Sequence, residues 1–197
     1  VASNSLDEYL IRDLMMQEAK IDTFGVGERL ITAKSAPVFG GVYKLAAVED
    51  EQGNIIPKIK ISENTAKITN PHYKKLYRFY DNESGKALAD ELCVYDETID
   101  STKPHTIFDP DAIWKTKTLT DYTARELHVT VFKNGELVYK QPSLYEIRIY
   151  CAEQLETLWD EVKRFENPHT YYVDLSKKLW DIKNALLEKS KDGKDLK

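Results

Sequence analysis

Two short polar segments near the N-terminus have the composition of phosphate-binding loops. Ser3 and Asn4 form one segment, and Gly25, Val26 and Gly27 form the other. Because glycine has no side chain, the backbone can approach an anion closely, and successive N–H groups can donate hydrogen bonds to phosphate oxygens. The side chains of Ser3 and Asn4 offer further polar groups. The segments are therefore candidate phosphate-binding loops, although a Gly-x-Gly sequence alone is more often a simple tight turn.

Other residue types give weaker chemical signals. Lys44 could add positive charge near the loops, but a solvated strand lysine is the simpler interpretation. The two cysteines, Cys93 and Cys151, lie far apart and predict no disulfide framework. Cys151 falls on an apolar helical stripe and is expected in the core. The four histidines show no spacing of four residues and no neighbouring cysteine, so no metal site is predicted.

The candidate loops follow the two strands of a strand–helix–strand unit that we predict in residues 1–33. Residues 1–3 and 20–24 have the composition of short strands, with leucines at helical spacing between them. Ser5, followed three residues later by Glu8, has the pattern of an N-terminal capping box. Strands joined in this way are parallel, and ligands of parallel α/β folds bind at the carboxyl ends of the strands. Both loops are therefore expected at one sheet edge.

Residues 34–141 have the pattern of an antiparallel β-rich region. Short polar turns separate the apolar segments, and Asn134-Gly135 strongly indicates a type I′ hairpin. Residues 96–121 contain proline and several aspartates and are interpreted as a long excursion. The strands are expected in pairs at residues 42–48 with 55–62, 76–80 with 86–95, and 127–133 with 136–140.

Residues 142–197 are predicted to be helical. Ser143 and Glu146 form a second capping-box pattern. From Leu144 to Phe165, apolar residues recur at steps of three and four, which predicts about six helical turns that face the core. Asp174 is expected to cap the last helix.

Composition excludes several classes of protein. The 197 residues are 42% hydrophobic and 31% charged, which is typical of a globular chain and not of a disordered one. A net charge of −5 argues against a nucleic-acid-binding protein. No apolar run approaches the roughly 18 residues of a membrane span. The polar N-terminus is not a signal peptide and lacks an initiator methionine, so we expect a cytoplasmic protein whose chain here begins inside a longer one.

Seven short motifs follow one another along nearly the whole chain. They are ASNSLDE at residues 2–8, KIDTFGVG at 20–27, LITA at 30–33, GGVYKL at 40–45, VFKNG at 131–135, NP at 167–168 and YVDLS at 172–176. In this order they resemble the C-terminal half of nicotinate phosphoribosyltransferases. That family joins nicotinate to phosphoribosyl pyrophosphate and forms nicotinate mononucleotide and pyrophosphate in NAD biosynthesis. Many members couple the reaction to ATP hydrolysis.

The resemblance implies an α/β fold, which is α+β within this segment. Residues 1–33 would supply the last strand–helix–strand part of the α/β barrel of a type II phosphoribosyltransferase. Residues 34–141 would form an antiparallel β-rich region beside that barrel, and residues 142–197 a C-terminal helical appendage. Members of the family are commonly homodimers with sites near the subunit interface.

The resemblance also implies roles for the candidate residues. Ser3 and Asn4 match the penultimate barrel loop, and residues 25–27 match the final loop, both of which hold the ribose 5-phosphate. Lys44 matches a lysine that reaches a phosphate group, in a partner subunit's site. The residues that bind nicotinate and pyrophosphate lie upstream in the family, so no catalytic residue and no metal ligand is expected here. Mg²⁺ and ATP would serve the whole enzyme, and the segment alone is expected to hold neither and to be inactive.

Two residues depart from the family pattern. Ser5 stands where many members have Asp, and Glu28 stands where many have Thr. The Glu28 carboxylate would lie beside the presumed phosphate loop, which is electrostatically unfavourable unless the side chain points away. Two alternatives stay open, namely a relative that uses nicotinamide and a stand-alone binding or structural module without catalysis.

Overall fold

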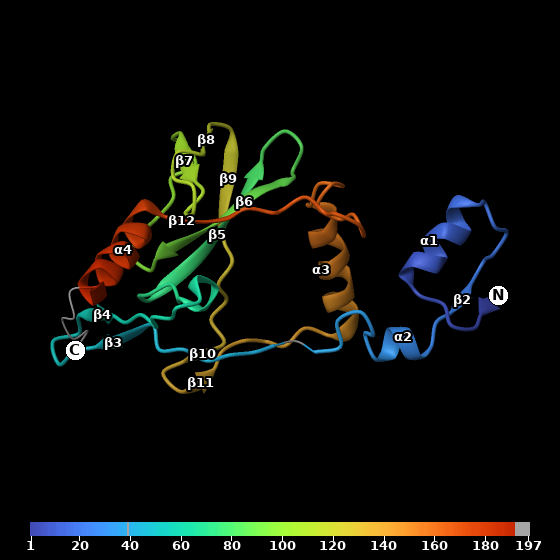
Figure 1. Cartoon of the computed structure of the whole chain (residues 1–197), viewed down its shortest axis with the longest axis horizontal. Coiled ribbons are helices and arrows are strands. Elements are labelled where there is room, and N and C mark those ends of the chain that lie inside the picture. The colour runs from blue at the N-terminus through green and yellow to red at the C-terminus, as the bar shows by residue number, and fades with distance from the viewer. Residues whose placement is uncertain (39, 192–197) are drawn as a thin grey trace. The chain divides into compact units, whose positions relative to one another are not determined.

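The computed structural model describes residues 1–38 and 40–191 and divides into two compact units. The first unit is Val1–Tyr43 and the second is Lys44–Lys197 (Figure 1). Residues 192–197, at the end of the predicted helical region, lie outside the described residues. The described part contains four α-helices and several small sheets, which confirms the mixed α/β class. None of its helices is long and apolar enough to cross a membrane.

The first unit has the predicted strand–helix–strand arrangement. Strands β1 and β2 are parallel, with Ser3 opposite Gly25, so the two candidate loops begin at the same sheet edge. The second strand is shorter than the sequence pattern predicts and starts only at Phe24. The elements are β1 (Ala2–Ser3), α1 (Glu8–Met16), β2 (Phe24–Gly25) and α2 (Glu28–Ile31).

The N-cap of helix α1 is Asp7, and the prediction of Ser5 is wrong. Asp7 has an extended backbone, and its carboxylate accepts a hydrogen bond from the Leu10 N–H at 2.9 Å. Ser5 has a φ of 53°, because the chain turns sharply after β1. A capping residue normally has an extended backbone, so the left-handed Ser5 cannot cap the helix.

A four-stranded sheet is the centre of the second unit (Figure 1). Its strand order is β12-β6-β5-β9, with β5 antiparallel to both β6 and β9 and with β12 parallel to β6. The predicted hairpin with its turn near residues 81–85 is confirmed as β5 and β6. Phe79, Cys93 and Tyr122 are fully buried in the core against this sheet. The strands are β5 (Lys74–Asp81), β6 (Ala87–Val94), β9 (Tyr122–Glu126) and β12 (Val173–Leu175).

The described part of the second unit also contains three two-stranded sheets. Asn134 and Gly135 have φ values of 53° and 82°, which confirms the predicted type I′ turn. The hairpin β7–β8 corrects the expectation of a long excursion, because Ile107 and Leu119 from this segment pack into the core. The pairs are β3 (Ala47–Glu49) with β4 (Ile55–Pro57), β7 (His105–Phe108) with β8 (Thr116–Leu119), and β10 (Phe132–Lys133) with β11 (Glu136–Leu137).

Helix α3 (Leu144–Glu156) is helical as predicted, but its apolar stripe is not in a core. The capping box of Ser143 and Glu146 is present, and the helix ends well before Phe165. None of its side chains is buried, Leu144 is 83% exposed, and Cys151 is exposed. The prediction of a core-facing stripe and of a buried Cys151 is therefore wrong for this chain. The spacing predicted the helix itself correctly, but the described residues bury none of its side chains.

The sequence predicted that Asp174 caps the last helix, but this is wrong, because Asp174 lies in strand β12. Helix α4 (Lys177–Lys191) begins after Ser176, whose hydroxyl accepts a hydrogen bond from the Leu179 N–H at 3.2 Å. Asp174 is only 5% exposed. Burial, with a contribution from the nearby carboxylates of Asp109 and Glu91, raises the pKa of Asp174 to about 6.

Replacement of Asp174 by asparagine is expected to stabilise the purified protein near neutral pH. The folded protein holds the Asp174 proton more tightly than the unfolded chain, whose pKa is near 3.8, so stability falls as the pH rises through about 6. The shift corresponds to at most about 3 kcal/mol, and because the Asp174 side chain borders an open cavity we expect Asp174→Asn to gain about 1–2 kcal/mol.

Urea unfolding of both proteins between pH 4 and about 7.5 measures this effect. The difference between Asp174→Asn and the wild type should vanish near pH 4 and grow toward pH 7. Asp111→Asn changes an exposed carboxylate on a nearby loop and should leave the pH dependence unaltered. An equal pH dependence in wild type and Asp174→Asn would contradict the raised pKa.

Candidate phosphate-binding site

The two predicted loops form one pocket within the first unit. The pocket has a volume of about 220 Å³ and lies where β1 and β2 end. Four of the predicted residues line it, namely Ser3, Asn4, Gly25 and Gly27, whereas Val26 lies in the same loop but does not line the pocket. The other lining residues are Ser5, Leu6, Glu28, Arg29 and Lys34.

Ser3 and Gly25 hold the two loops in close contact. The Ser3 hydroxyl donates a hydrogen bond to the Gly25 carbonyl oxygen at 3.1 Å. A Cβ atom on Gly25 would lie 3.2 Å from the Ser3 Oγ atom, so a larger residue would require the Ser3 side chain to shift by a few tenths of an ångström. Gly27 has open space around it, which leaves room for a ligand beside the backbone.

The backbone after β1 is in an unusual conformation. Asn4 and Ser5 have φ values of 91° and 53°, in the left-handed region that few residues other than glycine and asparagine adopt readily. Such a conformation costs about 1–3 kcal/mol per residue and is concentrated at ligand sites. The strain at Asn4 and Ser5 therefore supports a binding role for this turn.

Two basic side chains at the pocket were missed by the sequence analysis. Arg29 pairs with the Asp7 carboxylate, which also caps helix α1. The Lys34 ammonium lies 3.9 Å from the carboxylate of Glu28. Lys34 thus offsets the charge of Glu28, whose side chain is 76% exposed. Single basic residues after a glycine loop are too common to be recognised from sequence, and it is the turn through α2 that places them here.

Lys44 does not line this pocket, and the described residues of the pocket form no metal-binding cluster. Lys44 is an exposed residue at the start of the second unit, so its role at a phosphate stays a prediction. Across residues 1–38 and 40–191, no group of three or more His, Cys, Asp or Glu side chains is placed to hold a metal ion. The polar groups of the pocket are hydroxyl, amide, backbone and cationic groups, which suit an anion, together with the Glu28 carboxylate, which Lys34 offsets.

A sequence profile described as the nicotinate phosphoribosyltransferase C-terminal domain matches residues 73–183, more than half of the chain. The chain belongs to this family. The nicotinate phosphoribosyltransferase of Bacillus subtilis is 40% identical over 183 residues, which cover 93% of this chain and 37% of the relative. That of Dictyostelium discoideum is 34% identical and covers 100% of this chain and 34% of the relative. The chain thus spans about a third of the length of these curated nicotinate phosphoribosyltransferases.

The crystal structure of human nicotinic acid phosphoribosyltransferase has a similar fold. Its TM-score is 0.68 at 23% sequence identity, over 94% of this chain and 32% of the human chain. The profile match lies in the second unit, over the central sheet, helix α3 and the first part of helix α4. Family membership in nicotinate phosphoribosyltransferases, which are transferases, is therefore established from residues outside the candidate pocket. The phosphate role of that pocket is an independent proposal.

Proposed function

We propose that this chain is the C-terminal part of a nicotinate phosphoribosyltransferase. The whole enzyme would form nicotinate mononucleotide and pyrophosphate from nicotinate and phosphoribosyl pyrophosphate, with coupled ATP hydrolysis, in NAD salvage. Membership in the family and identities of 34–40% to curated relatives support this reaction. Because the chain covers only about a third of those relatives, the remaining chemistry would belong to the rest of the polypeptide.

We infer this chain's own role from the pocket at the ends of β1 and β2. Ser3, Asn4 and the backbone of residues 25–27 would bind the ribose 5-phosphate. Displacement at the anomeric carbon develops positive charge on the ribose, and the protein accelerates it chiefly by positioning the reactants and stabilising charge. Groups at the 5-phosphate hold the ribose in place and transfer no proton. These residues are therefore binding residues and not catalytic ones.

Mg²⁺ and ATP, which the proposed reaction uses, are assigned to no residue of this chain. The described side chains offer no cluster of carboxylates, imidazoles or thiols for a metal ion. We place the metal and the nucleotide with the rest of the polypeptide.

The exposed face of α3 supports the association of this chain with that remaining part. Leu144, Tyr145 and Leu155 are at least half exposed, and apolar residues occur on more than one side of the helix. A helix of this kind is normally buried. We propose that the missing barrel portion covers it, and that the complete protein is a cytoplasmic homodimer.

The experiment that tests the function uses the polypeptide encoded by the complete reading frame. Nicotinate, phosphoribosyl pyrophosphate, Mg²⁺ and ATP are supplied, and nicotinate mononucleotide and released phosphate are followed directly. We expect product from nicotinate, phosphate release that depends on the reaction, and no product from residues 1–197 alone. Product only from nicotinamide would show that the enzyme uses nicotinamide in place of nicotinate. No product from either base would overturn the proposal.

A further inference from the structure

Asp174 is a buried carboxyl group without a hydrogen-bond partner among the described residues. It lies in β12, where its backbone is opposite Glu91 of β6, and its side chain lines a cavity. Only 5% of the residue is exposed, and no described group donates a hydrogen bond to its carboxyl oxygens. Buried carboxyl groups are normally paired or hydrogen-bonded, because leaving them unpaired is costly. An unpaired carboxyl group at a cavity wall therefore points to a ligand that donates hydrogen bonds to it.

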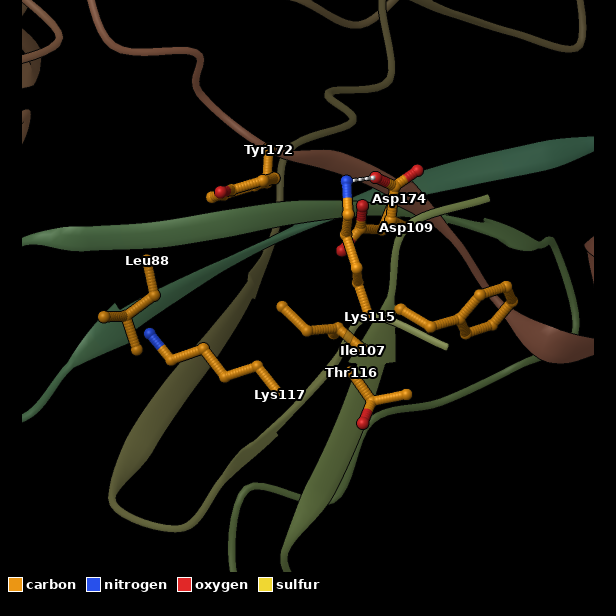
Figure 2. Close-up of a pocket in the computed structure, with 9 residues that line it drawn as sticks. Leu88, Ile107, Asp109, Lys115, Thr116, Lys117, Tyr172 and Asp174 are labelled. Carbon is orange, nitrogen blue, oxygen red and sulfur yellow. Dashed lines mark ion pairs between the residues drawn. The ribbon is translucent and has the colours of Figure 1, made fainter. Parts of the chain in front are cut away.

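The cavity beside Asp174 has the size and lining for one aromatic ring. Its volume is about 200 Å³, and Leu88, Ile107 and Phe108 form its apolar part. Figure 2 shows Leu88 and Ile107 in this lining. Apolar cavities of about 150 Å³ are known to bind benzene. Thr116, Lys117 and Tyr172 provide polar lining on the same cavity.

The charges around the cavity leave Asp174 as the group that needs a donor. Lys115 pairs with Asp109 at 3.5 Å, as the dashed line in Figure 2 shows. Among the described residues, Asp174 forms no ion pair with Lys115. Glu91 is paired with His105 at 2.8 Å. The carboxylates of Asp109 and Glu91 make the immediate surroundings of Asp174 more negative, which favours N–H donors at this carboxyl group. The Lys117 ammonium also lines the cavity and is the further cationic group of its lining.

We propose that this cavity binds a small planar ligand whose amidine-type edge donates two hydrogen bonds to the carboxyl oxygens of Asp174. The ring of the ligand would lie against Leu88 and Ile107. A planar pair of N–H donors matches the two oxygens of a carboxylate in a bidentate geometry. The site belongs to the second unit and shares no residue with the phosphate pocket of the first, so it does not depend on the proposed function.

The test uses benzamidine as the probe and the polypeptide of the complete reading frame. Binding is measured by calorimetry and by ligand-observed NMR in the presence of saturating nicotinate, which occupies the proposed base site of the complete protein. Benzoate, which has the same ring but no donors, is the matched ligand. We expect benzamidine to bind with a millimolar Kd and benzoate not to bind. The variant Asp174→Asn keeps the side-chain volume and should weaken benzamidine binding by about 10- to 100-fold.

Asp111→Asn is the matched protein control. Asp111 is an exposed carboxylate two residues after Asp109, and it does not line this cavity. This substitution should change the benzamidine Kd by less than about twofold. Far-UV circular dichroism shows whether both variants keep the fold. Equal binding by wild type and Asp174→Asn, equal binding of benzoate and benzamidine, or no binding by the wild type would each overturn the proposal.

Discussion

Replacement of Asp90 by alanine is expected to lower the free energy of unfolding by about 3–5 kcal/mol. Asp90 lies in β6, is only 4% exposed, and stands opposite Arg78 of β5. The Arg78 guanidinium donates two hydrogen bonds to its carboxylate, at 2.8 and 2.9 Å, and the Tyr171 hydroxyl donates a third at 2.8 Å. The alanine variant would leave all three donors without an acceptor.

The cost is large because the partners of Asp90 are themselves partly buried. Hydrogen bonding to Asp90 raises the pKa of Arg78, and burial together with the same carboxylate raises the pKa of Tyr171. Both residues are therefore adapted to a negative charge at this position. The Asp90 N–H also donates to the Tyr172 carbonyl oxygen at 3.0 Å, so the network connects β5, β6 and the segment before β12.

Urea unfolding of the purified protein measures the loss, with Asp96→Ala as the control. Asp96 forms an ion pair with Lys178 at 2.6 Å, but both side chains are about half exposed. Exposed pairs contribute about 0–1 kcal/mol, so Asp96→Ala should have a small effect. A loss at Asp90 no larger than that at Asp96 would show that the buried network does not stabilise the sheet.

Signals that act over a few residues account for the correct fold predictions. The turn between β5 and β6, the Asn134-Gly135 hairpin and the capping box of Ser143 each depend on neighbours within about four positions. The backbone geometry of such elements is set by local sterics and hydrogen bonds. They can therefore be read from the sequence before any tertiary contact is known.

Features that depend on distant partners were missed. Strand β12 is three residues long and exists because it pairs with β6, far earlier in the chain, so a reading of residues 173–175 favoured a helix cap at Asp174. The spacing of apolar residues in α3 predicted the helix correctly but could not show what packs against it. Propensity and periodicity describe a segment, whereas burial describes its partner.

The candidate pocket shows the same division. Glycine and small polar residues predicted the loops, and the parallel pairing of β1 and β2 brings them together as expected. Arg29 and Lys34 reach the pocket because the chain turns through helix α2, and no sequence pattern predicted this helix. The polarity of the site was thus predictable, while the cations that balance Glu28 were not.

Substitution of Asn4 by aspartate is expected to raise the KM for phosphoribosyl pyrophosphate by about 10- to 100-fold in the complete protein. Asn4 lines the pocket and has a left-handed backbone with a φ of 91°, which aspartate tolerates as asparagine does. The change therefore adds one negative charge with little change of shape. Two like charges about 4 Å apart repel by about 1 kcal/mol in water and by about 4 kcal/mol near a protein surface.

The matched control is Asn64→Asp, which makes the same change of charge in the second unit. Asn64 is exposed and caps a short 3₁₀ helix (Thr65–Lys67), where aspartate caps equally well. Steady-state kinetics should show a raised KM for phosphoribosyl pyrophosphate in Asn4→Asp alone. The KM for nicotinate should change little, because under the proposed function only the 5-phosphate would lie beside the new carboxylate. An unchanged KM for phosphoribosyl pyrophosphate would remove the 5-phosphate from this pocket, while the family membership, which depends on residues 73–183, would stand.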